Sequence, residues 1–363
     1  MSRVRNADET SYMQIYRRIK RDIVDKIYPY NSKIPSKRTI ASEFGVSVIT
    51  VEHAYDLLCD EGYIRSVQRS GYFVDFKSTD GFSSFPDKEP STILTNTTYE
   101  NEASSFGFPS TVLCKTMRKV ITNREEDILQ KSPNSGTLEL RESIARYLAR
   151  NKDIRVDPSR IVVGSGAEYL YNLIASLIGR GTKVALEDPS YDKIIRVYDS
   201  FGISCDFLPM TKDGIKSSSL KATDAKVLHI SPFRSYPSGI SASASKRHEY
   251  IRWADERSGL IIEDDYESEF SVLGKPVETL FSMADNDNVI YLNTFSKTIS
   301  PALRVGYMVL PENLLWVFNE QLGFYSCTVP TFEQLVLSEL LSGGAFERHI
   351  NRVRRKIRSS LPT

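Results

Sequence analysis

The sequence is poor in cysteine and histidine, which narrows the kinds of site it can hold. Its four cysteines, Cys59, Cys114, Cys205 and Cys327, lie far apart and form no C-x-x-C pair. The four histidines never stand at the spacing of metal ligands. A disulfide framework needs paired cysteines and a zinc site needs clustered ligands. Neither is indicated, and we expect no bound metal.

Long hydrophobic runs and an excess of one charge are also absent. No apolar run approaches the roughly 20 residues that span a bilayer, and none follows the polar start of the chain. We therefore expect a cytoplasmic protein with no membrane partner. The formal net charge of +1 over 363 residues says little about partners, because a large neutral body dilutes a small charged domain. That length allows two or three domains.

Residues 1–76 carry the pattern of three helices and a β-hairpin. The first predicted helix covers residues 12–28 and is ended by Pro29. Its buried face is formed by isoleucines at every fourth position, namely Ile15, Ile19, Ile23 and Ile27. At the far end of this segment, two short strands joined through Ser70-Gly71 are predicted at 62–65 and 71–76.

A helix-turn-helix lies between these elements. Ser36 can cap a helix that runs to Phe44, and Gly45 makes the tight turn after it. Ser47 can cap the third helix, whose inward-facing residues are Val51, Ala54, Leu57 and Leu58. Helical bundles with no affinity for DNA have similar segments, so this pattern alone leaves both interpretations open.

The rest of the chain differs from residues 1–76 in composition and in the pattern of its predicted elements. Residues 77–104 are rich in Ser, Thr, Asp, Pro and Gly and are predicted to be an extended or disordered linker. From 105 to 363, helical stretches such as 138–150 and 169–177 alternate with short apolar strands. The predicted strands are 160–163, 183–186, 225–230, 259–262 and 289–292. Such alternation predicts an α/β fold, a mostly parallel sheet with flanking helices, whose ligands lie at the carboxyl ends of the strands.

Candidate site residues follow these strands. The segment 165–167 opens a helix, where backbone N–H groups favour an anion such as phosphate, although two glycines can also form a mere tight turn. Tyr191 can stack on a conjugated ring, or it is a core tyrosine. Consecutive carboxylates at 263–265 are costly after an apolar strand unless a positive group pairs with them. A solvated loop and, less favoured, a magnesium site are the alternatives.

A lysine between small polar residues is the most informative feature. Lys297 ends the segment Asn293-Thr294-Phe295-Ser296-Lys297, and Arg304 comes seven positions later. An isolated lysine is usually a surface charge. This spacing, however, resembles the cofactor lysine and phosphate arginine of pyridoxal phosphate (PLP) proteins of fold type I. The interval of 33 positions between Asp264 and Lys297 also matches that family.

The N-terminal segments 34–38, 46–51, 54–58 and 61–64 are similar to the winged helix-turn-helix head of GntR regulators. Head and lysine pattern together resemble the MocR-type branch of that family, in which the head is fused to an aminotransferase-like domain. The resemblance implies double-stranded DNA as a partner. The implied DNA contacts are Lys37, Arg38, Ser47, Thr50 and, at the wing tip, Gly71.

The same resemblance implies a PLP site. Asp264 would keep the pyridine nitrogen protonated, Tyr266 would donate to the phenolic oxygen, and Tyr191 would stack on the ring. The phosphate cradle would consist of Ser165, Gly166, Ala167, Ser296 and Arg304. Lys297 would carry the cofactor covalently as a free amine, so burial beside other cations should lower its pKa.

The sequence departs from the family pattern at several places. Val48 stands where the family often has arginine, Arg234-Ser235 where it has His-Gln, and Lys193 where some relatives have a ligand-binding arginine. Residues 346–358 predict a basic helix with a solvated face, a second DNA contact being a minor alternative. The family then continues into a small subdomain with a carboxylate-binding arginine, which we expect to be missing here.

These features favour a transcription regulator for which PLP, or its adduct with an amino acid or amine, is the effector. The alternatives are an aminotransferase with a vestigial head and a truncated relic that binds DNA constitutively. The complete head and the missing carboxylate clamp favour regulation. Residues 1–76 contain twelve Lys/Arg and ten Asp/Glu, a surplus too small for tight binding by one head. We therefore expect a homodimer.

Overall fold

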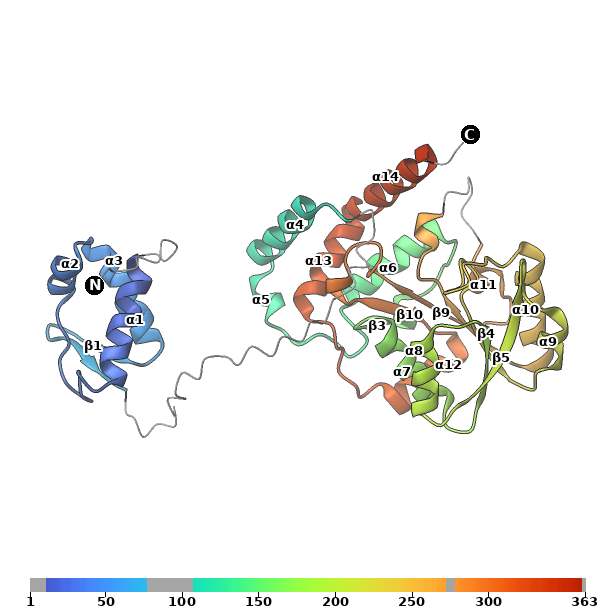
Figure 1. The fold of residues 1–363 in the computed structure, drawn as a ribbon, viewed down its shortest axis with the longest axis horizontal. Coiled ribbons are helices and arrows are strands. Elements are labelled where there is room, and N and C mark those ends of the chain that lie inside the picture. The colour runs from blue at the N-terminus through green and yellow to red at the C-terminus, as the bar shows by residue number, and fades with distance from the viewer. Residues whose placement is uncertain (1–10, 77–106, 272–277, 361–363) are drawn as a thin grey trace, which may run out of the picture. The chain divides into compact units, whose positions relative to one another are not determined.

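The computed structural model describes residues 11–76, 107–271 and 278–360. The chain divides into two compact units, Met1–Tyr99 and Glu100–Thr363 (Figure 1). We call them the head and the body. The predicted linker, residues 77–104, lies outside the described residues.

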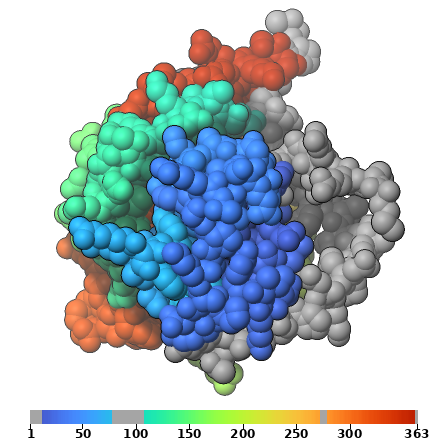
Figure 2. Space-filling model, turned by 90° about the vertical axis from the view of Figure 1, so that its left-hand side faces the viewer, coloured from blue at the N-terminus to red at the C-terminus, as the bar shows by residue number. Residues whose placement is uncertain are grey.

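The head is a winged helix-turn-helix, as the sequence predicts. It contains α1 (Ser11–Val24), α2 (Lys37–Phe44), α3 (Val48–Asp60), β1 (Ile64–Val67) and β2 (Gly71–Val74). Ser36 and Ser47 accept hydrogen bonds from the backbone N–H groups of Thr39 and Thr50, at 3.2 and 3.1 Å, so both predicted caps are confirmed. Gly45 has φ +66°, which places the turn in the left-handed region. Figure 2 shows the β1–β2 wing, in light blue, standing out from the helices.

The prediction for the end of the first helix is wrong. Helix α1 ends at Val24, before Pro29, because the backbone N–H of Ile27 bonds to the Asp22 carbonyl in a turn. Ile27 is consequently 60% exposed, whereas the other three isoleucines are buried. Tyr55, which the helical pattern did not place inward, is fully buried and donates a 2.7 Å hydrogen bond to the Pro35 carbonyl.

The body contains one mixed sheet of eight strands in the order β3-β10-β9-β8-β7-β4-β5-β6. Their bounds are β3 (Ile161–Gly164), β4 (Lys183–Asp188), β5 (Ser204–Thr211), β6 (Gly214–Ile215), β7 (Val227–Ile230), β8 (Leu260–Asp264), β9 (Val289–Thr294) and β10 (Gly306–Val309). Strands β5, β4, β7, β8 and β9 run parallel, and β10 is antiparallel to both β9 and β3. All five predicted strands are confirmed. β5, β6 and β10 were not predicted.

Alternate residues of the strands face two helical layers, as a sheet covered on both sides requires. Tyr307 packs with α4 (Ser110–Asn123), α6 (Leu138–Asn151), α13 (Thr331–Ser342) and α14 (Ala345–Ser360). Its neighbour Met308 packs on the opposite face with α7 (Ala167–Ile178), α8 (Asp192–Ser200) and α12 (Glu312–Leu322). The remaining helices are α5 (Glu125–Ile128), α9 (Ser217–Ala222), α10 (Ala244–Arg257) and α11 (Leu280–Met283).

Helix α14 confirms the predicted basic helix. Its side chains Arg348, Arg352 and Arg355 are exposed, while Phe346 and Ile350 on the other side are buried in the core. Among the described residues, no helix has both the length and the apolar character needed to cross a membrane.

Candidate functional site

The sheet brings the predicted cofactor residues to one edge. Gly306, the first residue of β10, pairs with Gly164 at the end of β3 and with Thr294 at the end of β9. Asp264, the last residue of β8, pairs with Leu292 of β9. The segments that follow β3, β8 and β9, and the residue Arg304 before β10, therefore start from adjacent strand ends. This is the position at which open α/β sheets bind ligands.

Asp264 has one carboxylate oxygen satisfied and one open. The hydroxyl of Tyr171 donates to Oδ2, whereas the buried Oδ1 has no partner among the described residues. Burial raises the pKa of Asp264 to about 7. A buried acceptor without a partner is costly, and the protonated nitrogen of a pyridine ring would supply the missing donor. This orphaned oxygen shows that the site fits PLP.

His229 and Tyr198, which the sequence did not single out, lie next to Asp264 in the core. His229 of β7 places Nε2 4.0 Å from Asp264 Oδ2, and its Nδ1 bonds to the Tyr198 hydroxyl at 2.7 Å. Burial lowers the pKa of His229 to about 3, so the ring is neutral at physiological pH. Only Tyr171 donates a hydrogen bond to the carboxylate, whereas His229 packs beside it and its Nε2 has no hydrogen-bond partner among the described residues. The only sequence signal was a histidine within an apolar strand, which is more often a core residue.

The environment of Lys297 differs from the one expected. Its side chain is 40% exposed, and Nζ lies 3.8 Å from Glu267 Oε1 and 4.8 Å from the centre of the Tyr266 ring. The expectation that Lys297 is buried beside other cations is therefore wrong, because an acidic side chain faces it. Glu267 also lies 3.3 Å from the Arg234 guanidinium, so this carboxylate links two cations at the mouth of the site.

The two predicted ring contacts lie on neighbouring loops. Tyr266 donates a 2.6 Å hydrogen bond to the Arg234 carbonyl. Tyr191, after β4, meets Tyr236 edge to face, with ring centres 5.5 Å apart. The Arg234-Ser235 departure has a structural role, since Ser235 donates a 2.7 Å hydrogen bond to the buried carboxylate of Glu187. These contacts fix the loop around the proposed ring position.

The predicted phosphate cradle lies at the start of α7. Gly166 precedes this helix with φ +92°, and a Cβ built on it would stand 3.3 Å from the Arg304 guanidinium. Arg304 therefore lies directly over the helix start, where the dipole favours an anion. The Ser165 N–H donates to Thr328 Oγ1 at 3.0 Å. Ala167 is the first residue of α7, and Ser296 is half-buried beside Lys297.

A buried ion-pair network fixes the loop after β8. Lys152 Nζ lies 2.8 Å from Asp265 Oδ2 and 3.7 Å from Glu269 Oε1, and all three side chains are at most 6% exposed. The Tyr291 hydroxyl donates to Asp265 at 2.7 Å. Of the consecutive carboxylates, Asp265 has the positive partner that its burial required, whereas Glu263 accepts hydrogen bonds from the backbone N–H groups of Leu280 and Phe281. The sequence did not identify Lys152, because it lies at the end of a helix far along the chain.

Ionisation of the buried carboxyl groups predicts that stability falls as pH rises. Burial raises the pKa of Asp264 to about 7 and that of Glu263 to about 8, so the folded protein holds protons that the unfolded chain has already released. Below its ordinary pKa of 6.5, His229 opposes this effect. We expect the unfolding free energy of cofactor-free protein to fall from pH 6.5 to 8. Thermal unfolding at several pH values measures this dependence, and the decrease in stability should be smaller in Asp264→Asn. Stability that increases from pH 6.5 to 8 would contradict the raised pKa values of the two carboxyl groups.

In the head, the predicted DNA-binding residues differ in their exposure and in whether they already have a side-chain partner. Arg38 is exposed, whereas Lys37 pairs with Glu52. The hydroxyls of Ser47 and Thr50 bond to each other at 2.8 Å. At the start of α3, Val48 and Ile49 are 41% and 64% exposed, and Gly71 opens the wing strand with φ +113°. Arg38 is thus available for phosphate, while Lys37 must leave Glu52 first.

Two family descriptions match the chain. Residues 94–361 match aminotransferase class I and II, and residues 11–74 match bacterial regulatory proteins of the gntR family. The chain is 30% identical to the uncharacterised HTH-type transcriptional regulator YdeL of Bacillus subtilis (strain 168), over 98% of this chain and 78% of the relative. It is 28% identical to the pyridoxine biosynthesis regulator PdxR of Corynebacterium glutamicum, over 95% and 76%. The probable rhizopine catabolism regulatory protein MocR of Rhizobium meliloti is 25% identical, over 97% and 76%.

Solved aminotransferase structures share the fold of the body. An archaeal alanine:glyoxylate aminotransferase has a TM-score of 0.62 and 25% identity, over 67% of this chain and 62% of that structure. The α-aminoadipate aminotransferase LysN of Thermus thermophilus, complexed with N-(5'-phosphopyridoxyl)-L-leucine, has a TM-score of 0.60 and 26% identity, over 68% and 64%. This chain thus spans less than two thirds of either enzyme. Fold, strand-end geometry and the open Asp264 oxygen together indicate PLP binding.

Proposed function

This chain belongs to the MocR-type branch of the GntR family of transcriptional regulators, and from that premise we propose that it is a DNA-binding regulator that responds to PLP. The head binds an operator, and PLP or its adduct with an amino acid or amine is the effector. The observation that carries the effector half of this proposal is the open Oδ1 of Asp264 at the strand edge that also carries Lys297.

Different residues of the body would bind different groups of the cofactor. PLP supplies an electron sink when it is bound. Asp264 would accept the ring N–H, and Lys297 would provide the amine that binds the cofactor covalently. Tyr191 would stack on the ring, and Tyr266 would orient its phenolic oxygen once its hydroxyl has turned away from the Arg234 carbonyl. The phosphate would be held by Arg304, by Ser296 and by the N–H groups of residues 165–167. To do so, the Ser165 N–H would release Thr328 Oγ1 and the Gly166 N–H would release the Gly164 carbonyl.

Aminotransferase activity is the second candidate. The aminotransferase-like domain and the pair Lys297–Asp264 favour it, since both groups that the cofactor chemistry needs are at the edge of one sheet. Regulation is preferred because the matched relatives over nearly the whole chain are named as regulators. Sustained transfer of amino groups between an amino acid and a keto acid over many turnovers would reverse this preference.

We propose further that the protein acts as a homodimer. The surplus of two basic residues over residues 1–76 gives one head few net phosphate contacts. Two heads on one operator add their contacts, so the second binds at a high effective concentration. Sedimentation measured with and without PLP tests this proposal, and a monomer at concentrations that saturate DNA would contradict it.

Replacing Arg38 by alanine should weaken binding to the DNA upstream of the gene and make it less dependent on salt. The side chain is exposed beside the start of α2, and loss of one phosphate contact lowers the slope of log K against log salt by about 1 for each head. Fluorescence anisotropy at several salt concentrations measures both quantities. Arg18→Ala is the control, because Arg18 is 61% exposed and pairs with Asp22 on α1. Equal affinity of wild type and Arg38→Ala at every salt concentration would refute the contact.

A further inference from the structure

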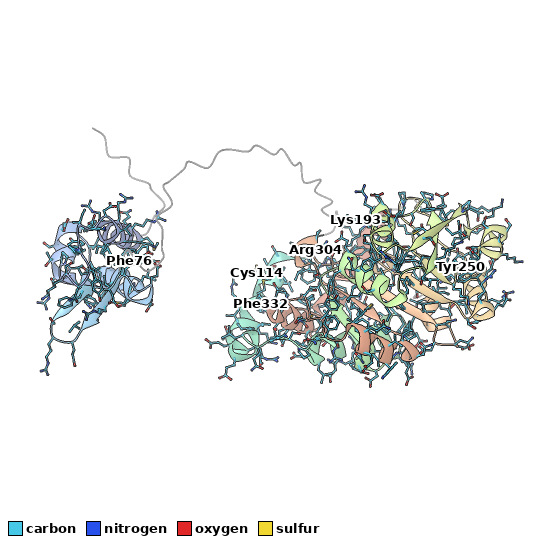
Figure 3. The ribbon with its side chains drawn as sticks, turned by 90° about the horizontal axis from the view of Figure 1, so that it is seen from below. Phe76, Cys114, Lys193, Tyr250, Arg304 and Phe332 are labelled. Atoms are coloured by element: carbon cyan, nitrogen blue, oxygen red, sulfur yellow. The ribbon has the colours of Figure 1, made fainter. Side chains whose placement is uncertain are left out.

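Glu168 lies beside the predicted phosphate cradle and pairs with its cation, Arg304, and with Lys193. It is the second residue of α7. One carboxylate oxygen accepts a hydrogen bond from the Arg304 guanidinium and the other from Nζ of Lys193. Figure 3 labels Arg304 and Lys193, which lie on the same side of the body. One side chain therefore engages both cations that stand at the start of this helix.

The surroundings show that this position favours an anion. The Arg304 guanidinium lies over Gly166, and the helix start adds its own partial positive charge. Burial raises the pKa of Glu168, but the hydrogen bonds from Lys193 and Arg304 outweigh burial, and the net effect lowers this pKa. The carboxylate is therefore ionised at neutral pH and is the anion that now occupies this position.

We propose that Glu168 is an internal anion that competes with the phosphate of PLP for Arg304 and Lys193 and so lowers the affinity for the cofactor. The inference rests on the proposed function. A phosphate dianion that binds Arg304 and Lys193 competes with the carboxylate for their donors and stands close to a group of like charge. Glu168 thus keeps PLP binding reversible, as a sensor of cofactor concentration requires.

A supporting role for Glu168 in phosphate binding predicts the opposite change in PLP affinity. If its carboxylate merely oriented Arg304 for phosphate, removal of the charge would weaken PLP binding. The side chains of Glu168, Arg304 and Lys193 are 31%, 53% and 55% exposed, so the rearrangement that frees both cations takes place at the surface and needs no change in the core. Competition is favoured because each oxygen of Glu168 already accepts a hydrogen bond, one from Arg304 and the other from Lys193. Each cation must break that bond before the same donor can serve phosphate.

The test compares full-length wild type with Glu168→Gln. The dissociation constant for PLP, measured by visible absorbance and by quenching of intrinsic fluorescence, should fall about three- to tenfold, as expected for loss of one partly exposed charge interaction. Affinity for pyridoxal, which lacks the phosphate, should not change. Calorimetry with inorganic phosphate on cofactor-free protein should show tighter binding. Glu142→Gln, which removes an exposed carboxylate paired with Arg146 on α6, should leave all three values as in wild type.

The outcomes separate this inference from the proposed function. Wild type that binds PLP, with a Glu168→Gln variant that binds it equally or more weakly, overturns the competition and leaves the function standing. Tightening for pyridoxal as well as PLP also overturns it, because the effect then does not act on phosphate. Wild type that binds no PLP overturns both. Glu168→Ala should change affinity in the same direction, and thermal unfolding confirms that each variant is folded.

Discussion

Replacing Lys297 by alanine will abolish the visible absorbance that the protein acquires with PLP. Lys297 lies beside the Tyr266 ring, on the segment that follows β9, at the edge of the sheet where Asp264 ends β8. Lys193, the other lysine near the site, pairs with Glu168, so the position of attachment has to be measured directly. Absorbance spectra of wild type and variant, followed by borohydride reduction and peptide mass measurement, check both attachment and position.

The control for this experiment is Lys183→Ala. Lys183 pairs with Asp224 and is 41% exposed, so its removal deletes a lysine without touching the site. Its spectrum should equal that of wild type. A band that persists in Lys297→Ala, or a reduced adduct on a different lysine, would contradict the covalent assignment.

The largest loss of stability is expected for Lys152→Ala. Its Nζ is the positive charge that pairs with Asp265 and Glu269 within a buried network, with side chains 6%, 0% and 2% exposed. Removal of the lysine leaves two carboxylates close together without a cation, and breaking a buried pair in this way typically costs about 3–5 kcal/mol. Urea unfolding, followed by circular dichroism, measures the change in the free energy of unfolding.

Lys119→Ala is the matched control for that measurement. Lys119 of α4 pairs with Glu339 of α13 at 2.6 Å, but its side chain is 55% exposed. Such surface pairs contribute at most about 1 kcal/mol. Equal effects of the two substitutions would show that the interior network does not stabilise the body. Addition of PLP should not rescue Lys152→Ala fully, since the loop that carries Tyr266 depends on this network.

Local patterns predicted most of the fold. Strands such as β7 and β9 were visible because apolar runs of suitable length stand between turn residues. β10 was not predicted because it begins at Gly306, and a glycine at that position weakens the pattern of a strand. Strand β5, which lies between β4 and the edge strand β6, carries the exposed Phe207 and the polar Asp206, and these residues break the apolar pattern of a buried strand. The end of α1 was misplaced since a turn at Lys26, with φ +60°, stops the helix before Pro29 can do so.

The site was predictable where it follows a linear motif. Lys297, Asp264 and Arg304 were singled out because their spacing resembles that of PLP proteins of fold type I, and the structure brings them to adjacent strand ends, while their cofactor roles stay predictions. Lys152 and His229 act through contacts across 113 and 35 positions, and nothing local marks them. The acidic neighbour of Lys297 was visible as Glu267 in the sequence, but its direction depends on the loop conformation.

Both anchors of the cofactor depend on one connection, because residues 295–305 join β9 to β10 with Gly306 opposite Thr294. A single insertion or deletion there would disturb the covalent and the phosphate anchor together, and it could not be absorbed by sliding β10, which is also paired with β3. This segment should therefore tolerate changes of residue type far better than changes of length. In a library of one-residue deletions across the body, we expect no functional variant with a deletion in residues 295–305.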